Sequence, residues 1–295
     1  MTDPIISIKF EGGDADQHTV DMRLLGQSLQ GFDRIISDGI ILLSEGRLPK
    51  KRERAFLRVK AYAPKEGSHE ITAIIQDGPG YLTLGWQLLS ASEGKIIWHW
   101  ISFVIKYFGG RKSDAKEHLS AMLELNKQQL DARAVSDKQH LDARAASDDA
   151  WRNMVMTLVD RLGPAAAQAA APVGPSVTDA GVKVGSSEET VIDEAMADAI
   201  RAKGEVDVSD LQVMTLVTDG FFHHGRTLRV EHPLEPGRYF NASVKDPLFD
   251  LIPNKYTEAA SMGASIVVRA KAAYRAGQLE RLYIMDFVSL GPVSA

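Results

Sequence analysis

The chain has 295 residues, which is enough for two ordinary domains or one large one. Hydrophobic residues make up 44% and charged residues 25%, a composition that excludes a disordered or collagen-like chain. There is no cysteine, so disulfides, thiolate metal sites and a cysteine nucleophile are excluded together. The net charge of −5 is local, because residues 163–210 hold three basic and nine acidic side chains.

Residues 1–78 are predicted to form an α+β domain with the element order β-α-β-β-α. Ile5–Phe10 alternates apolar and polar residues, as a half-buried strand does. Apolar residues then recur at three- and four-residue spacing between residues 20 and 43, which predicts an amphipathic helix. Phe56–Tyr62 and Glu70–Gln76 form a predicted hairpin.

Residues 79–110 are a more apolar segment that we expect to be helical. Residues 96–105 carry no charge and would be about 15 Å long as a helix, roughly half a bilayer core. Two interpretations stay open: a helix buried in the core of an oligomer, or a segment that touches a membrane or lines a pore, with His99 and Ser102 as its polar face. The residues of the membrane interpretation are Trp98, His99, Trp100, Ile101, Ser102, Phe103 and Ile105.

Residues 111–162 contain an eleven-residue repeat, in which Leu130–Arg133 recurs as Leu141–Arg144. Neither Gly nor Pro occurs from Ser113 to Leu162, so the pattern predicts one long coiled-coil helix of about 75 Å. Such a helix cannot bury its apolar stripe alone, and we expect a homo-oligomer of three or more copies. The alternative is a single charged helix that lies on its own domain. The predicted oligomer seam consists of Leu119, Leu123, Leu130, Ala134, Leu141 and Ala145.

The C-terminal part is predicted to end in a small β-barrel. Residues 163–186 are rich in Ala, Pro and Gly and are predicted to be a linker, and residues 187–204 an acidic helix. Residues 205–295 hold five strand-like stretches with a helix between the third and the fourth, which is the element order of an OB-type barrel.

Catalytic signatures are missing from the sequence. It has no phosphate-binding GxxxxGK[ST] loop, no GxGxxG, no HExxH and no G-x-S-x-G elbow. We therefore expect a protein that is not an enzyme and that uses no cofactor and no metal.

Aromatic residues lie among basic ones in residues 205–295, an arrangement that holds single-stranded nucleic acid in small barrels because bases stack and phosphates pair. The expected ligand is a nucleotide or a single-stranded oligonucleotide; the alternative is a barrel that docks a partner protein. The candidate ligand-binding residues are Arg226, Arg229, Arg238, Tyr239, Lys255, Tyr256, Lys271 and Tyr274.

Several stretches together resemble a bacterial family that pairs two domains of unknown function around a coiled coil. They are Ile6–Gly13, Trp98–Trp100 with Phe108–Lys112, Asp246–Phe249, Tyr256–Ala260 and Tyr283–Asp286. More loosely, the layout is similar to oligomeric effectors of anti-phage signalling systems, which a nucleotide signal switches into membrane channels. That similarity implies a homo-oligomeric, membrane-active effector in the cytoplasm or at the inner membrane. The alternative is a soluble oligomeric scaffold whose barrel docks a partner protein.

Overall fold

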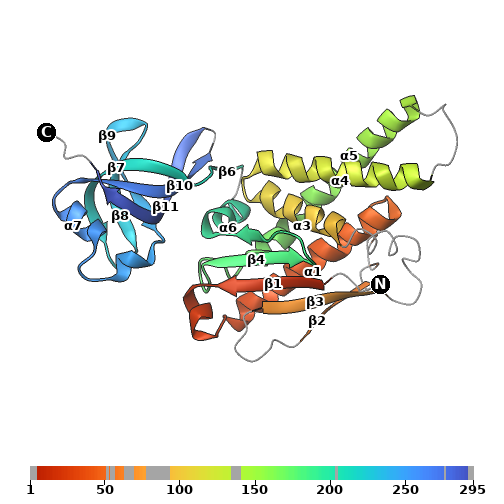
Figure 1. The fold of residues 1–295 in the computed structure, drawn as a ribbon, viewed down its shortest axis with the longest axis horizontal. Coiled ribbons are helices and arrows are strands. Elements are labelled where there is room, and N and C mark those ends of the chain that lie inside the picture. The colour runs from red at the N-terminus through yellow and green to blue at the C-terminus, as the bar shows by residue number, and fades with distance from the viewer. Residues whose placement is uncertain are drawn as a thin grey trace. The chain divides into compact units, whose positions relative to one another are not determined.

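A computed structural model describes residues 5–50, 53, 57–62, 70–77, 94–133, 141–202, 205–275 and 277–291. The side chains at 58, 75–77, 126–133 and 141–148 lie outside this description. The chain divides into an N-terminal unit, residues 1–201, and a C-terminal unit, residues 202–295. Each unit has a hydrophobic core of its own. Figure 1 labels the helices and strands along the chain.

The N-terminal unit is built on a five-stranded antiparallel sheet with the strand order β2-β3-β1-β4-β5. Its strands are β1 (Ile5–Glu11), β2 (Leu57–Ala61), β3 (Glu70–Asp77), β4 (Asp179–Val184) and β5 (Thr190–Ile192). The predicted alternation in β1 is present, because Ile6, Ile8 and Phe10 are buried on one face of the sheet. The sheet therefore buries one face only, and the helices have to cover it.

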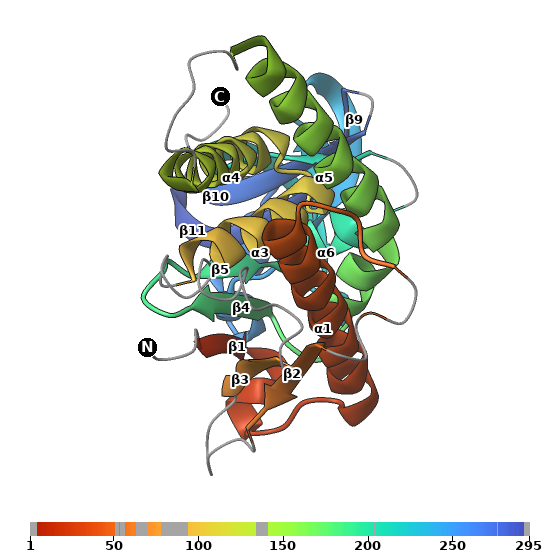
Figure 2. The same ribbon diagram turned by 90° about the vertical axis from the view of Figure 1, so that its right-hand side faces the viewer.

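Helices cover that face of the sheet (Figure 2). They are α1 (Met22–Glu45), α3 (Lys95–Phe108), α4 (Lys112–Arg133), α5 (Leu141–Ala169) and α6 (Glu194–Arg201), with a 3₁₀ turn η1 at Gly13–Gln17. Helix α5 packs along α1, and α4 packs on α3 on the side away from the sheet (Figures 1 and 2). The segments predicted separately as residues 1–78, 79–110, 111–162 and 187–204 thus contribute to one core.

The long coiled-coil helix predicted over residues 111–162 is not shown. The structure describes two helices instead, α4 and α5, and residues 134–140 between them lie outside the described residues. Each of the two helices packs on a helix of its own chain, since α4 lies on α3 and α5 on α1.

The predicted linker, residues 163–186, belongs to the core of the N-terminal unit. Helix α5 continues through Pro164 to Ala169, and β4 follows and pairs with β1. Ala165, Ala166, Ala169 and Ala170 are buried, and α1 approaches α5 closely where Gly31 faces the backbone of Ala165 and Ala169. The acidic helix predicted over residues 187–204 is shorter than expected, because β5 occupies the first part of this range and α6 begins only at Glu194. Asp193 caps α6 by accepting a hydrogen bond from Met196 N.

The C-terminal unit contains a closed five-stranded barrel, as predicted, with helix α7 (Lys255–Ser261) between the third and fourth strands. Its strands are β7 (Gln212–Phe222), β8 (Thr227–His232), β9 (Glu235–Val244), β10 (Ser265–Arg275) and β11 (Gln278–Leu290); the short β6 (Asp207–Val208) adds to β10. The strand order around the barrel is β7-β8-β9-β11-β10, and β10 pairs with β7 to close it. Among the strand pairings described in this unit, β9–β11 alone is parallel.

The close approach of α1 and α5 yields the first testable prediction. A Cβ atom at Gly31 would collide with the backbone of Ala165 and Ala169, whereas a Cβ at Gly26, on the same helix, meets nothing within 4 Å. We expect Gly31→Ala to lower the free energy of unfolding by about 1–3 kcal/mol. Gly26→Ala should raise it by about 0.5–1 kcal/mol, because alanine is the better helix former.

Urea unfolding followed by tryptophan fluorescence measures both changes. All four tryptophans belong to the N-terminal unit, so the signal reports on this unit alone. Equal stability of the Gly31→Ala and Gly26→Ala variants would contradict the packing described for α1 and α5.

Candidate functional site

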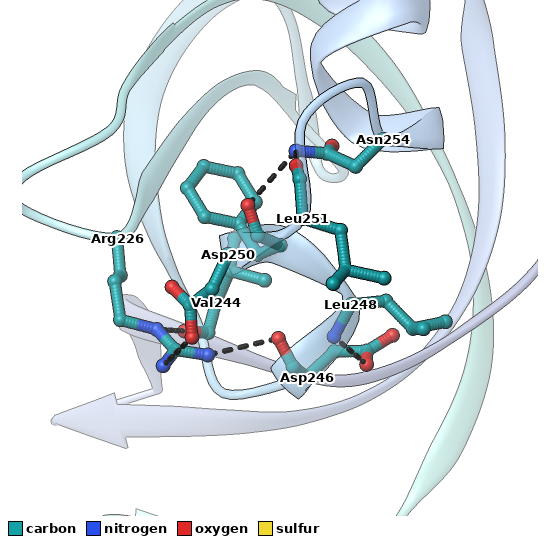
Figure 3. A network of polar contacts seen from close by, with 8 residues as sticks. Arg226, Val244, Asp246, Leu248, Asp250, Leu251 and Asn254 are labelled. Atoms are coloured by element: carbon teal, nitrogen blue, oxygen red, sulfur yellow. Dashed lines mark hydrogen bonds and ion pairs between the residues drawn. The ribbon is translucent and has the colours of Figure 1, made fainter.

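The best-defined polar network of the C-terminal unit holds the loop Asp246–Asn254, which we name the pinned loop (Figure 3). It connects β9 to α7 and contains a 3₁₀ turn, η3 (Pro247–Asp250). The buried carboxylate of Asp246 accepts hydrogen bonds from Leu248 N at 2.9 Å, from the Tyr256 hydroxyl at 2.7 Å and from Phe287 N at 2.9 Å. Hydrogen bonds from these three donors offset the free-energy cost of burying the carboxylate.

Arg226 fastens the same loop from the turn between β7 and β8. Its guanidinium donates to the carbonyl oxygens of Val244 at 3.2 Å and Asp246 at 2.8 Å, and it forms an ion pair with Asp250 at 2.7 Å (Figure 3). Arg226 makes these bonds from the left-handed region of the backbone map, with a φ of 45°. The sequence predicted Arg226 as a ligand-binding residue, and the structure gives its guanidinium three partners within the barrel.

Asn254 fastens the other end of the loop. Its Nδ2 donates to the carbonyl oxygens of Phe249 and Leu251, both at 2.8 Å, and its Oδ1 accepts from Thr257 N at the start of α7. This cap joins the loop to the helix. The loop is therefore held at both ends and in the middle by side chains of the barrel.

The pinned loop presents aliphatic side chains to solvent. Leu248, Leu251 and Ile252 are 51%, 57% and 82% exposed. Among the side chains that the structure describes, the C-terminal unit holds twelve of the sixteen exposed large hydrophobic residues, although it is the smaller unit. Apolar surface that a fold exposes on a rigid loop is a common mark of an interaction site.

The predicted ligand-binding residues are not gathered into one site. Tyr256 is fully buried, and both burial and its hydrogen bond to Asp246 raise the pKa of its hydroxyl. Tyr274 is partly buried against the barrel core, and Lys271 lies on β10. The exposed basic residues have acidic neighbours: Arg229 pairs with Asp219 at 2.9 Å, Arg238 with Glu235 at 2.8 Å and Lys255 with Glu258 at 3.0 Å.

Two of the predicted residues do lie together, on the outer face of β8 and β9. The Arg229 guanidinium is 5.9 Å from the centre of the Tyr239 ring, a cation–π distance, and both side chains are exposed. Phe222 lies on the neighbouring strand β7, opposite Thr227, and is also exposed. This surface offers aromatic faces beside one guanidinium.

Most of the predicted membrane segment is buried in the N-terminal unit. Trp100, Ile101, Phe103 and Ile105 belong to its core, and Trp100 Nε1 donates to the carbonyl oxygen of Ile35 at 2.8 Å. No helix in the described part of the chain combines the length and the hydrophobicity needed to cross a membrane.

The polar face expected for that segment is divided between two neighbours. Ser102 is hydrogen-bonded to Thr190 on β5, whereas His99 contacts His118 on α4, with 3.0 Å between their Nδ1 atoms. The Trp98 ring packs against both histidines, with ring centres 4.6 Å and 5.1 Å away. The face that was expected to line water is thus part of the packing between elements.

The predicted oligomer seam is described in part. Leu119 and Leu123 are partly buried against the core of their own unit. Ala134 and the side chains of Leu130, Leu141 and Ala145 lie outside the described residues. The homo-oligomer stays a prediction.

Comparison with known protein families gives one match for each of the two units. A family profile described as a domain of unknown function, DUF7946, matches residues 6–201, and one described as a family of unknown function, DUF7947, matches residues 210–288. The chain belongs to the DUF7946 family. The resemblance to a family with two adjacent domains of unknown function is confirmed, and the two matches fall within the two structural units. Searches of curated proteins and of solved structures found no match.

The histidine pair of the N-terminal unit gives a prediction for pH dependence. Burial, together with the nearby positive charge of Lys106 and the proximity of His99, lowers the pKa of His118 to about 4, while Asp114 acts in the opposite direction. An unfolded chain has a histidine pKa of about 6.5, so it binds a proton that the folded state excludes. We expect the free energy of unfolding to fall as the pH is lowered from 6.5 towards 4.

Urea unfolding at pH 7 and pH 5, followed by tryptophan fluorescence, measures this loss. The variant His118→Leu should lose less stability over that interval than the natural protein, and His18→Asn, at an exposed histidine of the same unit, should lose as much. An identical pH dependence of the natural protein and His118→Leu would show that His118 does not cause it.

Proposed function

We propose that this protein acts by binding, as an adaptor whose C-terminal barrel docks a partner protein through the pinned loop. The observation that carries the proposal is that a loop fastened by Arg226, Asp246 and Asn254 exposes Leu248, Leu251 and Ile252. A preorganised loop loses little conformational entropy on binding, so the apolar area that it buries contributes to affinity. Apolar side chains that a fold holds in solvent are typical of a surface that a partner covers.

The charges of the barrel support a protein ligand over an anionic one. The exposed basic residues at 229, 238 and 255 each have a carboxylate within 3.0 Å. A phosphate would have to compete with these carboxylates, whereas an apolar partner meets no competitor at the pinned loop.

Paired exposed variants test the docking surface. The double variant Leu251→Ser/Ile252→Ser removes two exposed aliphatic side chains, and Leu234→Ser removes one at the turn between β8 and β9, outside the pinned loop. When the natural protein and both variants are immobilised and exposed to lysate of the native host, we expect one protein to be retained by the natural chain and by Leu234→Ser. The double variant should retain at least about tenfold less, since each buried aliphatic side chain contributes about 1.5–3 kcal/mol.

Two results would contradict the proposal. Retention of the same proteins on all three chains would show that the pinned loop is not a docking surface. If light scattering shows an oligomer that the double variant alone dissociates, the loop binds a second copy of the chain and not a different protein.

A second candidate ligand is a single-stranded oligonucleotide on the outer face of β8 and β9. The exposed Arg229–Tyr239 pair favours it, and the strand order of the barrel matches that of OB-type barrels, which use this face for oligonucleotides. The membrane-channel function is not part of either proposal, because the apolar side chains of α3 are used in the core of the N-terminal unit.

Fluorescence anisotropy with a labelled oligothymidylate at low salt tests this second candidate. Tyr239→Ala should weaken binding by about fivefold or more if a base stacks on the ring. Tyr62→Ala, at an exposed tyrosine of the N-terminal unit, should leave it unchanged. If the natural chain does not bind the oligonucleotide, or if Tyr239→Ala binds it equally well, the second candidate is wrong.

A further inference from the structure

A cavity of about 280 Å³ lies beside the pinned loop. Its walls come from the loop, from α7 and from β11, and include Leu248, Leu251, Pro253, Tyr256 and Phe287. The exposed aliphatic side chains of the proposed docking surface and the walls of the cavity are therefore partly the same residues. A partner that covers the loop also covers the mouth of the cavity.

The polar groups around the cavity already have partners. The Asn254 amide makes three hydrogen bonds to the backbone of the loop and of α7, and the Tyr256 hydroxyl donates to Asp246. Lys255 and Glu258 form an ion pair with each other. A polar guest would compete with these interactions, whereas an apolar guest leaves all of them intact.

The charges near the cavity are also balanced. The two charged residues that line it, Lys255 and Glu258, pair with each other, so the described walls offer a charged guest no unpaired counter-ion. The electrostatic complement of this surface is a neutral segment.

The size of the cavity points to a single side chain. An apolar cavity of about 150 Å³ already holds a benzene molecule, so about 280 Å³ has room for one aromatic or aliphatic side chain. The walls are held in place by the network around Asp246, so the cavity exists before a guest arrives. Binding energy in protein interfaces concentrates where such a pocket receives an apolar anchor.

We infer that this cavity receives one uncharged apolar side chain, of the size of phenylalanine, leucine or methionine, from the partner protein. The inference rests on the proposed docking function and adds its anchor. The anchor side chain fills the cavity while neighbouring apolar residues of the partner cover Leu251 and Ile252.

Titration with a minimal anchor tests the cavity itself. The probe is N-acetyl-phenylalanine amide, added to the methyl-labelled full chain and followed by NMR, with N-acetyl-serine amide as the matched polar probe. We expect saturable shifts of the Leu248 and Leu251 methyl signals with the phenylalanine probe and none with the serine probe. The dissociation constant should lie in the millimolar range, as suits a single side chain.

A variant that fills the cavity provides the control. In Leu248→Trp the larger ring occupies the mouth, and we expect the phenylalanine probe to bind at least tenfold more weakly. Leu290→Trp places the same ring on a similarly exposed residue of β11 that does not line the cavity, and binding should be unchanged. The absence of saturable shifts, or equal binding to Leu248→Trp, would overturn the inference.

Retention of the partner separates this inference from the docking proposal. If Leu251→Ser/Ile252→Ser loses a partner that Leu248→Trp keeps, the docking surface stands and the anchor is wrong. If the natural protein retains no partner that depends on the pinned loop, the docking function is wrong, and so is the anchor that rests on it, even where the probe binds. Loss of the same partner in both variants, together with binding of the phenylalanine probe, supports the docking surface and the anchor alike.

Discussion

The buried carboxylate of Asp246 is the constraint on which the end of the barrel that carries the pinned loop depends. A charge in that position requires donors, and the donors come from the pinned loop, from α7 and from β11. Satisfying one carboxylate therefore fixes three elements relative to one another. The same hydrogen bonds hold Leu248 at the surface and set the shape of the adjacent cavity. The need to compensate a buried carboxylate therefore determines where the exposed apolar side chains of the loop lie.

The barrel could be predicted from the sequence because most of its pairings join neighbouring strands. Alternating residues and short turns indicate β7, β8 and β9, and the helical stretch that becomes α7 follows directly. The N-terminal sheet could be predicted only in part. β4 pairs with β1 across most of the unit, and it follows a stretch rich in Ala and Pro whose composition is also that of a linker. The alternation of Val182 and Val184 around Lys183 was the available signal.

The candidate site shows a different limit of sequence reasoning. Residue type indicated that Arg226 and Tyr256 could bind a ligand, but both side chains are hydrogen-bonded to Asp246, and Tyr256 is buried. The aliphatic residues Leu251 and Ile252 carry no chemical signature, since their importance lies in being exposed, and exposure depends on how the loop is fastened. The hydrogen bonds of Asn254 and Arg226, which hold the loop at the surface, join residues whose proximity the sequence does not reveal.

The pairing of β1 with β4 has a consequence for synthesis. β1 is made near the start of the N-terminal unit, but its register with β4 extends to Val184. At ordinary elongation rates roughly ten to thirty seconds separate the two strands, and meanwhile only the pairing with β3 is available to β1. The other edge of a central strand is open to neighbouring nascent chains during that interval. The centre of this sheet and one of its sides are thus synthesised before the other side.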